Sequence, residues 1–253
     1  MINICAVSYL NTVPFIYGIQ QILLEKEINI IEASPAICAQ KIINNDVCLG
    51  LVPVAELNRM YSVNIISDYC IGSYGPVDTV CVYSKIPINN VKKIYLDIDS
   101  RTSVELLKII LLEYWKISVD LVVVKNSFQF IDEFSAALVI GDKAFGLEKN
   151  FEYVYDLSSL WYEMTGLPFV FALWVSNIKL SDNFISNFNL ALQFGINNIS
   201  DALINIDHKN KFCNNPIVYL KKRISYDFDD KKKKGLQLFL DKMNNIYNSP
   251  KTI

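Results

Sequence analysis

Histidine is almost absent from this chain: among its 253 residues the only one is His208. It lies in the polar stretch NIDHKN (205–210), which predicts a surface loop and not a positioned general base. The sequence also lacks the patterns G-x-S-x-G, G-x-x-x-x-G-K-[ST] and G-x-G-x-x-G, so the common serine-hydrolase, P-loop and dinucleotide-binding motifs are excluded. Any chemistry must therefore use polar binding groups, or a base that the substrate supplies.

An excess of positive charge is missing as well. Lys and Arg number 24 against 26 Asp and Glu, which gives a formal net charge of −2, so the basic surface of a nucleic-acid-binding protein is not expected. The basic run 231–234 directly follows aspartates at 227, 229 and 230 and predicts a solvated helix start. No apolar run reaches the roughly 18 residues of a membrane span. We see no basic leader with a cleavage site, and we expect a cytoplasmic protein with neither nucleic-acid nor membrane partners.

Cysteine pairs with metal-ligand spacing are also lacking. The six cysteines stand at 5, 38, 48, 70, 81 and 213, with no C-x-x-C pair and no cluster of histidines. This usage indicates buried apolar thiols in a reducing compartment, and not a disulfide framework or a zinc site. We expect neither a metal nor another cofactor.

Hydrophobic residues are plentiful, at 52%, and their spacing alternates between strand-length runs and helix-period segments. The expected strands are 2–7, 47–52, 64–67, 77–83, 93–96, 121–124, 136–140 and 168–174. The expected helices are 13–25, 35–44, 53–60, 103–115, 143–148, 158–164, 181–198, 217–223 and 231–246. This order predicts an α/β fold with mostly parallel sheets flanked by helices.

The strands beyond position 80 predict a second α/β lobe inserted into the first. We expect lobe 1 to comprise 1–82 and 175–253 and lobe 2 to comprise 83–174, with crossing strands near 79–84 and 169–174. Neither crossing has the Gly-, Ser- or Pro-rich composition of a loose tether, which favours a hinge with a ligand cleft between the lobes. Ligands of open α/β sheets bind beyond the carboxyl ends of strands, so the strand-to-helix turns are the candidate site.

The strongest of these turns is DSRTSVE (99–105). Thr102 and Glu105 have the spacing of a capping box, with Thr102 as the N-cap. A helix N-terminus exposes N–H groups and a positive dipole end, and Arg101 adds a planar fork that suits a carboxylate. An anion seat and an ordinary cap with a surface arginine both fit this pattern. Asp97 and Asp99 lie two residues apart at a strand end. This spacing is more typical of carboxylates that solvate a turn than of a pair that shares catalysis.

Similar polar turns recur along the chain. Ser34 precedes a proline at a first helical position, IGDK (140–143) follows an apolar strand, and GSYGPVDT (72–79) joins two strands through two glycines. In SYLNTVPF (8–15) an apolar strand runs into an amide, a hydroxyl and a proline, and we expect Asn11 and Thr12 both to cap a helix and to face a ligand. The default interpretation of the aromatic segment 161–174 is core packing, although Phe169 can also stack on the flat ring of a ligand.

Six segments together resemble one enzyme family. They are SYLNTVPF (8–15), GPVDTV (75–80), SRTSVELL (100–107), IGDKA (140–144), DLSSLW (156–161) and TGLPFVFALW (165–174). In this order they resemble chorismate dehydratase, the MqnA family of the futalosine route to menaquinone. The resemblance implies a periplasmic-binding-protein type II fold with the ligand in the cleft. It also implies dehydration of chorismate to 3-[(1-carboxyvinyl)oxy]benzoate, a carbon–oxygen lyase reaction that needs no cofactor.

The resemblance also implies site residues. Asn11 is the Asn of the SYLN motif and the expected main catalytic contact, and Thr79, where some members carry a serine, is the second. Further residues are expected to bind the substrate, either because the resemblance implies them or because the polar turns suggest them. They are Ser8, Thr12, Ser100, Arg101, Thr102, Ser103, Gly141, Asp142, Thr165 and Phe169.

Two other functions remain open from the sequence. One is a carboxylate-binding protein or sensor of the same fold, which would return chorismate unchanged. The other is the sister enzyme 1,4-dihydroxy-6-naphthoate synthase, whose start is richer in Pro and Cys than SYLNTVPF.

Overall fold

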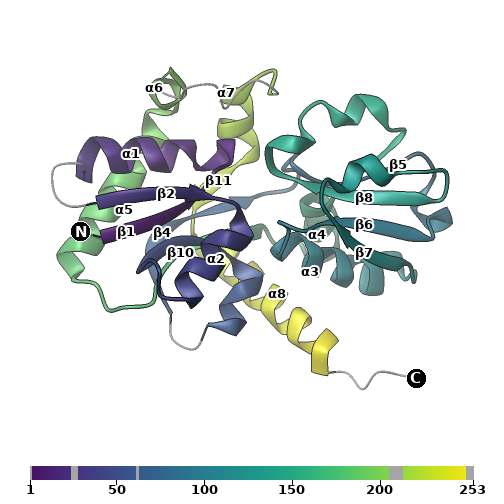
Figure 1. Cartoon of the computed structure of the whole chain (residues 1–253), viewed down its shortest axis with the longest axis horizontal. Coiled ribbons are helices and arrows are strands. Elements are labelled where there is room, and N and C mark those ends of the chain that lie inside the picture. Colours follow the sequence, from purple (N-terminus) through teal and green to yellow (C-terminus); the bar gives the residue numbers. More distant parts are fainter. Residues whose placement is uncertain (1, 24–27, 61–62, 205–212, 249–253) are drawn as a thin grey trace. The chain divides into compact units, whose positions relative to one another are not determined.

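The chain forms two compact units. A computed structural model describes residues 2–23, 28–60, 63–204 and 213–248, and the stretch around His208 lies outside them. Unit 1 comprises Met1–Ser73 and Val170–Asp229, and unit 2 comprises Tyr74–Phe169 and Asp230–Ile253. Figure 1 shows the elements of both units.

Unit 1 is built on a six-stranded sheet with the order β11-β4-β10-β3-β1-β2. Its strands are β1 (Ile2–Val7), β2 (Ile28–Ala33), β3 (Leu49–Pro53), β4 (Asn64–Ser73), β10 (Phe169–Ser176) and β11 (Ser225–Asp227). Strands β2 and β3 run parallel to β1, whereas β10 runs antiparallel to β3 and β11 antiparallel to β4. The sheet is therefore mixed. Its parallel part brings the carboxyl ends of β1, β2 and β3 to one edge.

The helices of unit 1 are mostly amphipathic. They are α1 (Val13–Leu23), α2 (Pro35–Ile43), α5 (Asp182–Asn197), α6 (Ile199–Ile204) and α7 (Pro216–Val218). Helix α7 continues into a π-helical turn, Tyr219–Arg223. Phe15 of α1 packs edge-on against Trp174 and Tyr226, with ring centroids 5.8 and 5.1 Å apart. These rings join α1 to β10 and β11 in the core of unit 1.

Unit 2 is built on a five-stranded sheet with the order β7-β6-β8-β5-β9 (Figure 1). Its strands are β5 (Val80–Ser84), β6 (Lys93–Asp97), β7 (Asp120–Val124), β8 (Ser135–Ile140) and β9 (Tyr153–Asp156). Strand β6 runs parallel to β7 and β8, and β5 runs antiparallel to β8 and β9. Because β5 is reversed, its first residue lies at the same edge as the last residues of the other four strands.

Three helices complete unit 2: α3 (Thr102–Ile109), which continues as a π-helical turn, Ile110–Trp115, then α4 (Leu157–Thr165) and α8 (Asp230–Asn248). Helix α8 is tied to α3 by polar contacts. The Tyr247 hydroxyl donates to Glu105 Oε1 at 2.7 Å, and Lys108 Nζ donates to the Tyr247 hydroxyl at 2.9 Å. Lys242 adds an ion pair with Glu113. These contacts dock the last helix of the chain on unit 2.

The unit boundaries differ from the lobe boundaries expected from the sequence, which were 83–174 for the inserted lobe. Unit 2 already begins at Tyr74, because β5 pairs with β8 and β9. Unit 1 resumes at Val170, because β10 pairs with β3. The helix at the end of the chain, assigned to lobe 1 by the expectation 175–253, belongs to unit 2. Its Phe239 ring packs against Trp161 and Phe169 at 6.2 and 5.1 Å.

The sequence also failed to predict three strands. Strands β2, β9 and β11 were not expected, and each lies at an edge of its sheet. Edge strands are covered on fewer sides, so their hydrophobic signal is weaker. The sheets are also mixed where mostly parallel ones were expected, because β5 and β10, next to the points where the chain passes between the units, run antiparallel to their neighbours.

The carboxylate of Asp156 holds the start of α4 and the chain before β5. Its Oδ1 accepts the backbone N–H groups of Ser158 and Ser159, both at 3.0 Å. Its Oδ2 accepts those of Val77 and Asp78 at 2.9 and 2.7 Å. Burial raises the pKa of Asp156, and these N–H donors oppose that rise. The side chain therefore shapes two turns at once.

We predict that Asp156→Asn lowers the free energy of unfolding by about 2–4 kcal/mol, because the amide NH2 would face two N–H donors that lose their acceptor. Urea unfolding of the full chain measures this. The matched control is Asp120→Asn, since Asp120 is exposed at the start of β7, and it should change the value by less than about 0.5 kcal/mol. Equal effects of the two variants would contradict the prediction.

Candidate functional site

Four polar turns meet at one edge of the unit 2 sheet. Asp97 ends β6, Gly141 follows β8, Thr79 precedes β5 and Asp156 ends β9. Val80 pairs with Ile140, and Cys81 with Asp156. Gly141 N donates to the carbonyl of Thr79 at 2.9 Å. The sequence-predicted residues Thr79, Gly141 and their neighbours are thus brought together by strand direction.

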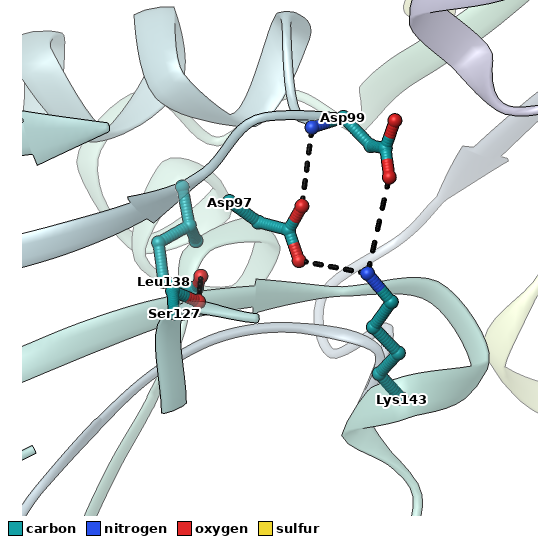
Figure 2. A network of polar contacts seen from close by, with 5 residues as sticks. All are labelled: Asp97, Asp99, Ser127, Leu138 and Lys143. Carbon is teal, nitrogen blue, oxygen red and sulfur yellow. Dashed lines mark hydrogen bonds and ion pairs between the residues drawn. The ribbon is translucent and has the colours of Figure 1, made fainter. Parts of the chain in front are cut away.

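An ion pair between a buried carboxylate, Asp97, and the partly exposed ammonium of Lys143 lies at this edge (Figure 2). Asp97 is 1% exposed, and its Oδ2 accepts a hydrogen bond from Lys143 Nζ at 3.0 Å. Its Oδ1 accepts the backbone N–H of Asp99 at 3.1 Å, and its carbonyl accepts that of Ser100 at 2.9 Å. Lys143 Nζ also lies 3.9 Å from Asp99 Oδ2. The carboxylate and carbonyl of Asp97 therefore fix the turn that leads into α3.

The start of α3 differs from the expected capping box. Arg101 is the N-cap, Thr102 is the first helical residue, and the Arg101 side chain makes no capping hydrogen bond. Glu105, expected to reach back to the helix start, instead accepts hydrogen bonds from Lys108 and Tyr247. The capping-box prediction was wrong because α8, remote in sequence, supplies a partner for Glu105. The N-cap side chain thus makes no bond to the first turn of α3, and the positive end of a helix suits an anion.

The hydroxyl of Ser100 strengthens this interpretation. Ser100 is 4% exposed, and among the described residues its Oγ has no hydrogen-bond partner. Ser127, at the same edge, is 0% exposed, but its Oγ donates to the carbonyl of Leu138 at 2.7 Å (Figure 2). Buried polar atoms in proteins are nearly always paired, so an unpaired hydroxyl beside a helix start indicates a place for a ligand oxygen.

Thr79, Gly141 and Asp142 have defined surroundings. Thr79 is 1% exposed, and its Oγ1 donates to the carbonyl of Val77 at 3.4 Å. Gly141 has a φ of +66°, a left-handed conformation that glycine adopts without strain. Asp142 is the second residue of the 3-10 turn Gly141–Ala144 and is partly buried. The backbone of Gly141 thus takes up the sharp change of direction after β8.

In unit 1, Ser8, Asn11 and Thr12 follow the carboxyl end of β1. Asn11 and Thr12 lie inside a 3-10 turn, Leu10–Thr12, that precedes α1. They were expected to cap a helix, but the N-cap of this turn is Tyr9, and Thr12 Oγ1 donates to Asn11 Oδ1 at 3.2 Å. The Asn11 carbonyl accepts the hydroxyl of Tyr226 at 2.9 Å. The Asn11 amide oxygen is therefore turned toward Thr12, with its backbone held from β11.

Ser8 and Ser34 lie beside each other in the same unit. Ser8 N donates to the carbonyl of Ala33 at 2.9 Å, as expected for the ends of two parallel strands. Ser34 is the N-cap of α2 with Pro35 at the first helical position, as the sequence predicted. Its hydroxyl, however, makes no capping bond and has no partner among the described residues.

Thr165 and Phe169 do not join the polar edge of unit 2. Thr165 ends α4, about 12 Å along the helix axis from the residue that follows Asp156. Its hydroxyl donates to the carbonyl of Trp161 at 2.7 Å. Phe169 is 1% exposed and packs against Trp161 and Phe239, with ring centroids 5.4 and 5.1 Å apart. The structure gives both residues local packing roles.

Sequence reasoning gave no site role to three residues at this edge, Asp97, Lys143 and Asp156; Asp97 was expected only to solvate a turn. All three lie in or beside motifs that the sequence analysis quoted, so their presence was visible but their contacts were not.

Within the described ranges, no group of three or more His, Cys, Asp or Glu side chains could hold a metal ion. The same ranges contain no helix long and apolar enough to cross a membrane.

The two mixed sheets flanked by helices define a protein of the periplasmic-binding-protein-like fold. A protein from Archaeoglobus fulgidus, AF1704, is similar with a TM-score of 0.74 and 17% identity, over 97% of each chain. The Candida albicans CA3427 gene product, described as having the generic periplasmic binding protein fold, gives a TM-score of 0.67 at 12% identity, over 99% of this chain and 92% of its own. The aliphatic sulphonate binding protein SsuA of Escherichia coli gives 0.64 at 12% identity, over 100% and 89%.

Within that fold, the chain belongs to the menaquinone biosynthesis family, whose family model matches residues 2–245. A curated relative, the chorismate dehydratase of Thermus thermophilus, is 27% identical over 169 residues. That match covers 57% of this chain and 60% of the relative, so it spans less than two thirds of the relative's length. The resemblance in the six motifs is thus confirmed at the level of the family.

We predict that Ser100→Ala leaves the free energy of unfolding unchanged or raises it by up to about 1 kcal/mol, because the variant removes a buried hydroxyl that lacks a partner. Ser127→Ala is the matched control, since it deletes a satisfied hydroxyl, and it should cost about 1–2 kcal/mol. Chemical unfolding of both variants tests this. A loss for Ser100→Ala as large as for the control would mean that the hydroxyl is paired within the protein.

Proposed function

We propose that this chain dehydrates chorismate to 3-[(1-carboxyvinyl)oxy]benzoate, the first step of the futalosine route to menaquinone. Membership of the menaquinone biosynthesis family and the similarity to a chorismate dehydratase support the proposal. The reaction makes it a carbon–oxygen lyase. We also propose that it works in the cytoplasm, a reducing compartment that suits its six free thiols.

The chemistry of the substrate suits the residues available. Chorismate is a dicarboxylate with a cyclohexadiene ring, and loss of its hydroxyl with a ring proton makes the ring aromatic. The driving force therefore lies in the substrate. The protein must orient two negative charges and stabilise the charge that develops on the departing oxygen. Neither task requires a histidine.

The observation that carries the proposal is the unpaired, buried hydroxyl of Ser100 beside a helix start whose N-cap side chain makes no capping bond. We propose that residues 100–103, here called the carboxylate seat, bind one substrate carboxylate. The seat comprises Ser100, Arg101, Thr102 and Ser103. Its helix dipole, hydroxyls and guanidinium are all suited to a carboxylate. Thr79, Gly141 and Asp142, at the same sheet edge, are proposed as further contacts.

In unit 1, we propose Asn11 as the main catalytic contact. Its amide oxygen is engaged by Thr12, which turns the NH2 end, a hydrogen-bond donor, away from that bond. A donor held in advance is suited to the developing negative charge of the departing oxygen. Ser8 and Thr12 flank Asn11 and belong to the same proposal, as do Thr165 and Phe169 through the family motif alone.

Incubation of the full chain with chorismate, followed by mass spectrometry, tests the reaction. We predict a product lighter than chorismate by one water, with the absorbance of an aromatic ring. Chorismate that is bound but returned unchanged would instead indicate a binding protein. Turnover of cyclic dehypoxanthine futalosine without turnover of chorismate would indicate the sister enzyme. Either result would overturn the proposed reaction.

Two substitutions should separate catalysis from binding. Asn11→Ala should lower kcat by more than about 10²-fold, the loss expected for one preorganised donor. Arg101→Ala should raise KM by about tenfold with kcat nearly unchanged, because the guanidinium contributes to binding the carboxylate. Steady-state kinetics measure both.

The control for these variants is Asn90→Ala, which truncates an exposed amide in the turn Ile88–Asn90 and should leave both constants unchanged. Activity of Asn11→Ala within severalfold of wild type would remove Asn11 from the catalytic role. A fall in kcat with constant KM in Arg101→Ala would contradict the carboxylate seat.

A further inference from the structure

We propose that Lys143 is a positioning residue: its ammonium cancels the buried charge of Asp97, so that the adjoining carboxylate seat can receive an anion. The inference rests on the proposed function, because it assigns the seat to a substrate carboxylate. Lys143 is the fourth residue of the IGDKA motif, and it is not among the residues that the family resemblance or the polar turns suggested as ligand contacts.

The first step of the argument is the burial of Asp97. Its side chain is 0% exposed, and an ionised carboxylate removed from water is costly unless it is paired. One oxygen accepts the Asp99 N–H at 3.1 Å and the other accepts Lys143 Nζ at 3.0 Å. Lys143, whose side chain is 35% exposed, thus supplies a cation that pairs with Asp97.

The second step is the position of Asp97 relative to the seat. Asp97 binds the turn twice, through its Oδ1 to Asp99 N and through its carbonyl to Ser100 N. Ser100 is the first residue of the seat, and α3 begins at Thr102. The charge state of Asp97 therefore acts both on the shape of the turn and on the potential that an anion meets there.

The third step is the local charge balance. Asp97 and Asp99 carry two negative charges and Lys143 and Arg101 two positive charges, while Asp142 in the turn Gly141–Ala144 adds one more negative charge. Removal of the ammonium leaves the Asp97 carboxylate without its cation and makes this group of charges more negative by one, beside a site for a carboxylate. Because this charge is buried, solvent screens it weakly, and anion binding should weaken by about tenfold.

A direct contact between Lys143 and the substrate is the alternative. The ammonium lies between two carboxylates, 3.0 Å from Asp97 Oδ2 and 3.9 Å from Asp99 Oδ2. Figure 2 shows its side chain reaching across the strand ends to both of them. An ammonium engaged in this way is suited to neutralising them, and this favours the positioning role over a direct one.

The test is a double-mutant cycle on the full chain, with the Kd for chorismate from calorimetry and with kcat and KM from turnover. Lys143→Gln keeps a hydrogen-bond donor for Asp97 but removes the charge. We expect it to raise Kd and KM by about tenfold with kcat within about threefold of wild type. Asp97→Asn combined with Lys143→Gln should return both constants to within about threefold of wild type, because no buried charge remains.

Two single variants complete the design. Lys143→Arg keeps the charge and should stay within about threefold of wild type. Lys149→Gln, an exposed lysine in the turn Leu147–Asn150, should change nothing. If Lys143→Gln fails to fold, the double variant and Lys143→Arg still test the inference, since both preserve charge balance at Asp97.

Three outcomes would overturn the inference. They are an unchanged Kd in Lys143→Gln, a Kd of the double variant as high as that of Lys143→Gln, and a fall in kcat of Lys143→Gln without a change in Kd. The second outcome would mean that Lys143 contacts the anion itself. Wild-type protein that binds chorismate without turning it over would overturn the proposed reaction, while the Kd values would still decide the role of Lys143. Wild-type protein that does not bind chorismate would overturn both.

Discussion

The buried carboxylate of Asp97 is the constraint on which the polar edge of unit 2 depends. A charge at that depth must be paired, and its two oxygens take the Lys143 ammonium and a backbone N–H. These contacts bend the chain between β6 and α3. The helix then begins with an N-cap side chain that makes no capping bond, next to a serine hydroxyl that has no partner among the described residues. One ion pair thus sets the geometry of a place suited to an anion.

A second aspartate, partly buried, has a comparable role at the same edge. Asp97 ends β6 and Asp156 ends β9, and each accepts backbone N–H groups of the following turn. Asp156 differs in that its charge is met by four N–H donors, two of them from the chain before β5. The loop that carries Thr79 is therefore held by the end of β9, the strand next to β5 in the sheet. Both carboxylates act on backbone, and the buried Ser100 hydroxyl has no partner among the described residues.

Much of the fold was predictable because it follows from periodicity. The bounds expected for β1, 2–7, coincide with those found, and the helix expected at 35–44 is α2, Pro35–Ile43. The family was predictable from the six motifs. The unit to which α8 belongs was not predictable, because the sequence of an amphipathic helix does not specify which apolar surface it covers. The contact of Phe239 with Trp161 and Phe169 decides this, and it depends on tertiary packing.

The same distinction holds for the site. Turns at strand ends could be located, because the direction of parallel strands brings them to one edge. The partners of individual side chains could not be inferred from local spacing. Glu105 has capping-box spacing, yet it pairs with a tyrosine 142 positions away. Lys143 stands in a quoted motif, but its pairing with Asp97, 46 positions away, is set by the sheet.

A crystal structure of the chain with 3-[(1-carboxyvinyl)oxy]benzoate bound tests the central claim most directly. We predict a carboxylate oxygen of this ligand within hydrogen-bond distance of Ser100 Oγ, with the ion pair between Asp97 and Lys143 intact. A ligand whose carboxylates both lie away from the start of α3, with the Ser100 hydroxyl donating to a protein carbonyl, would contradict it.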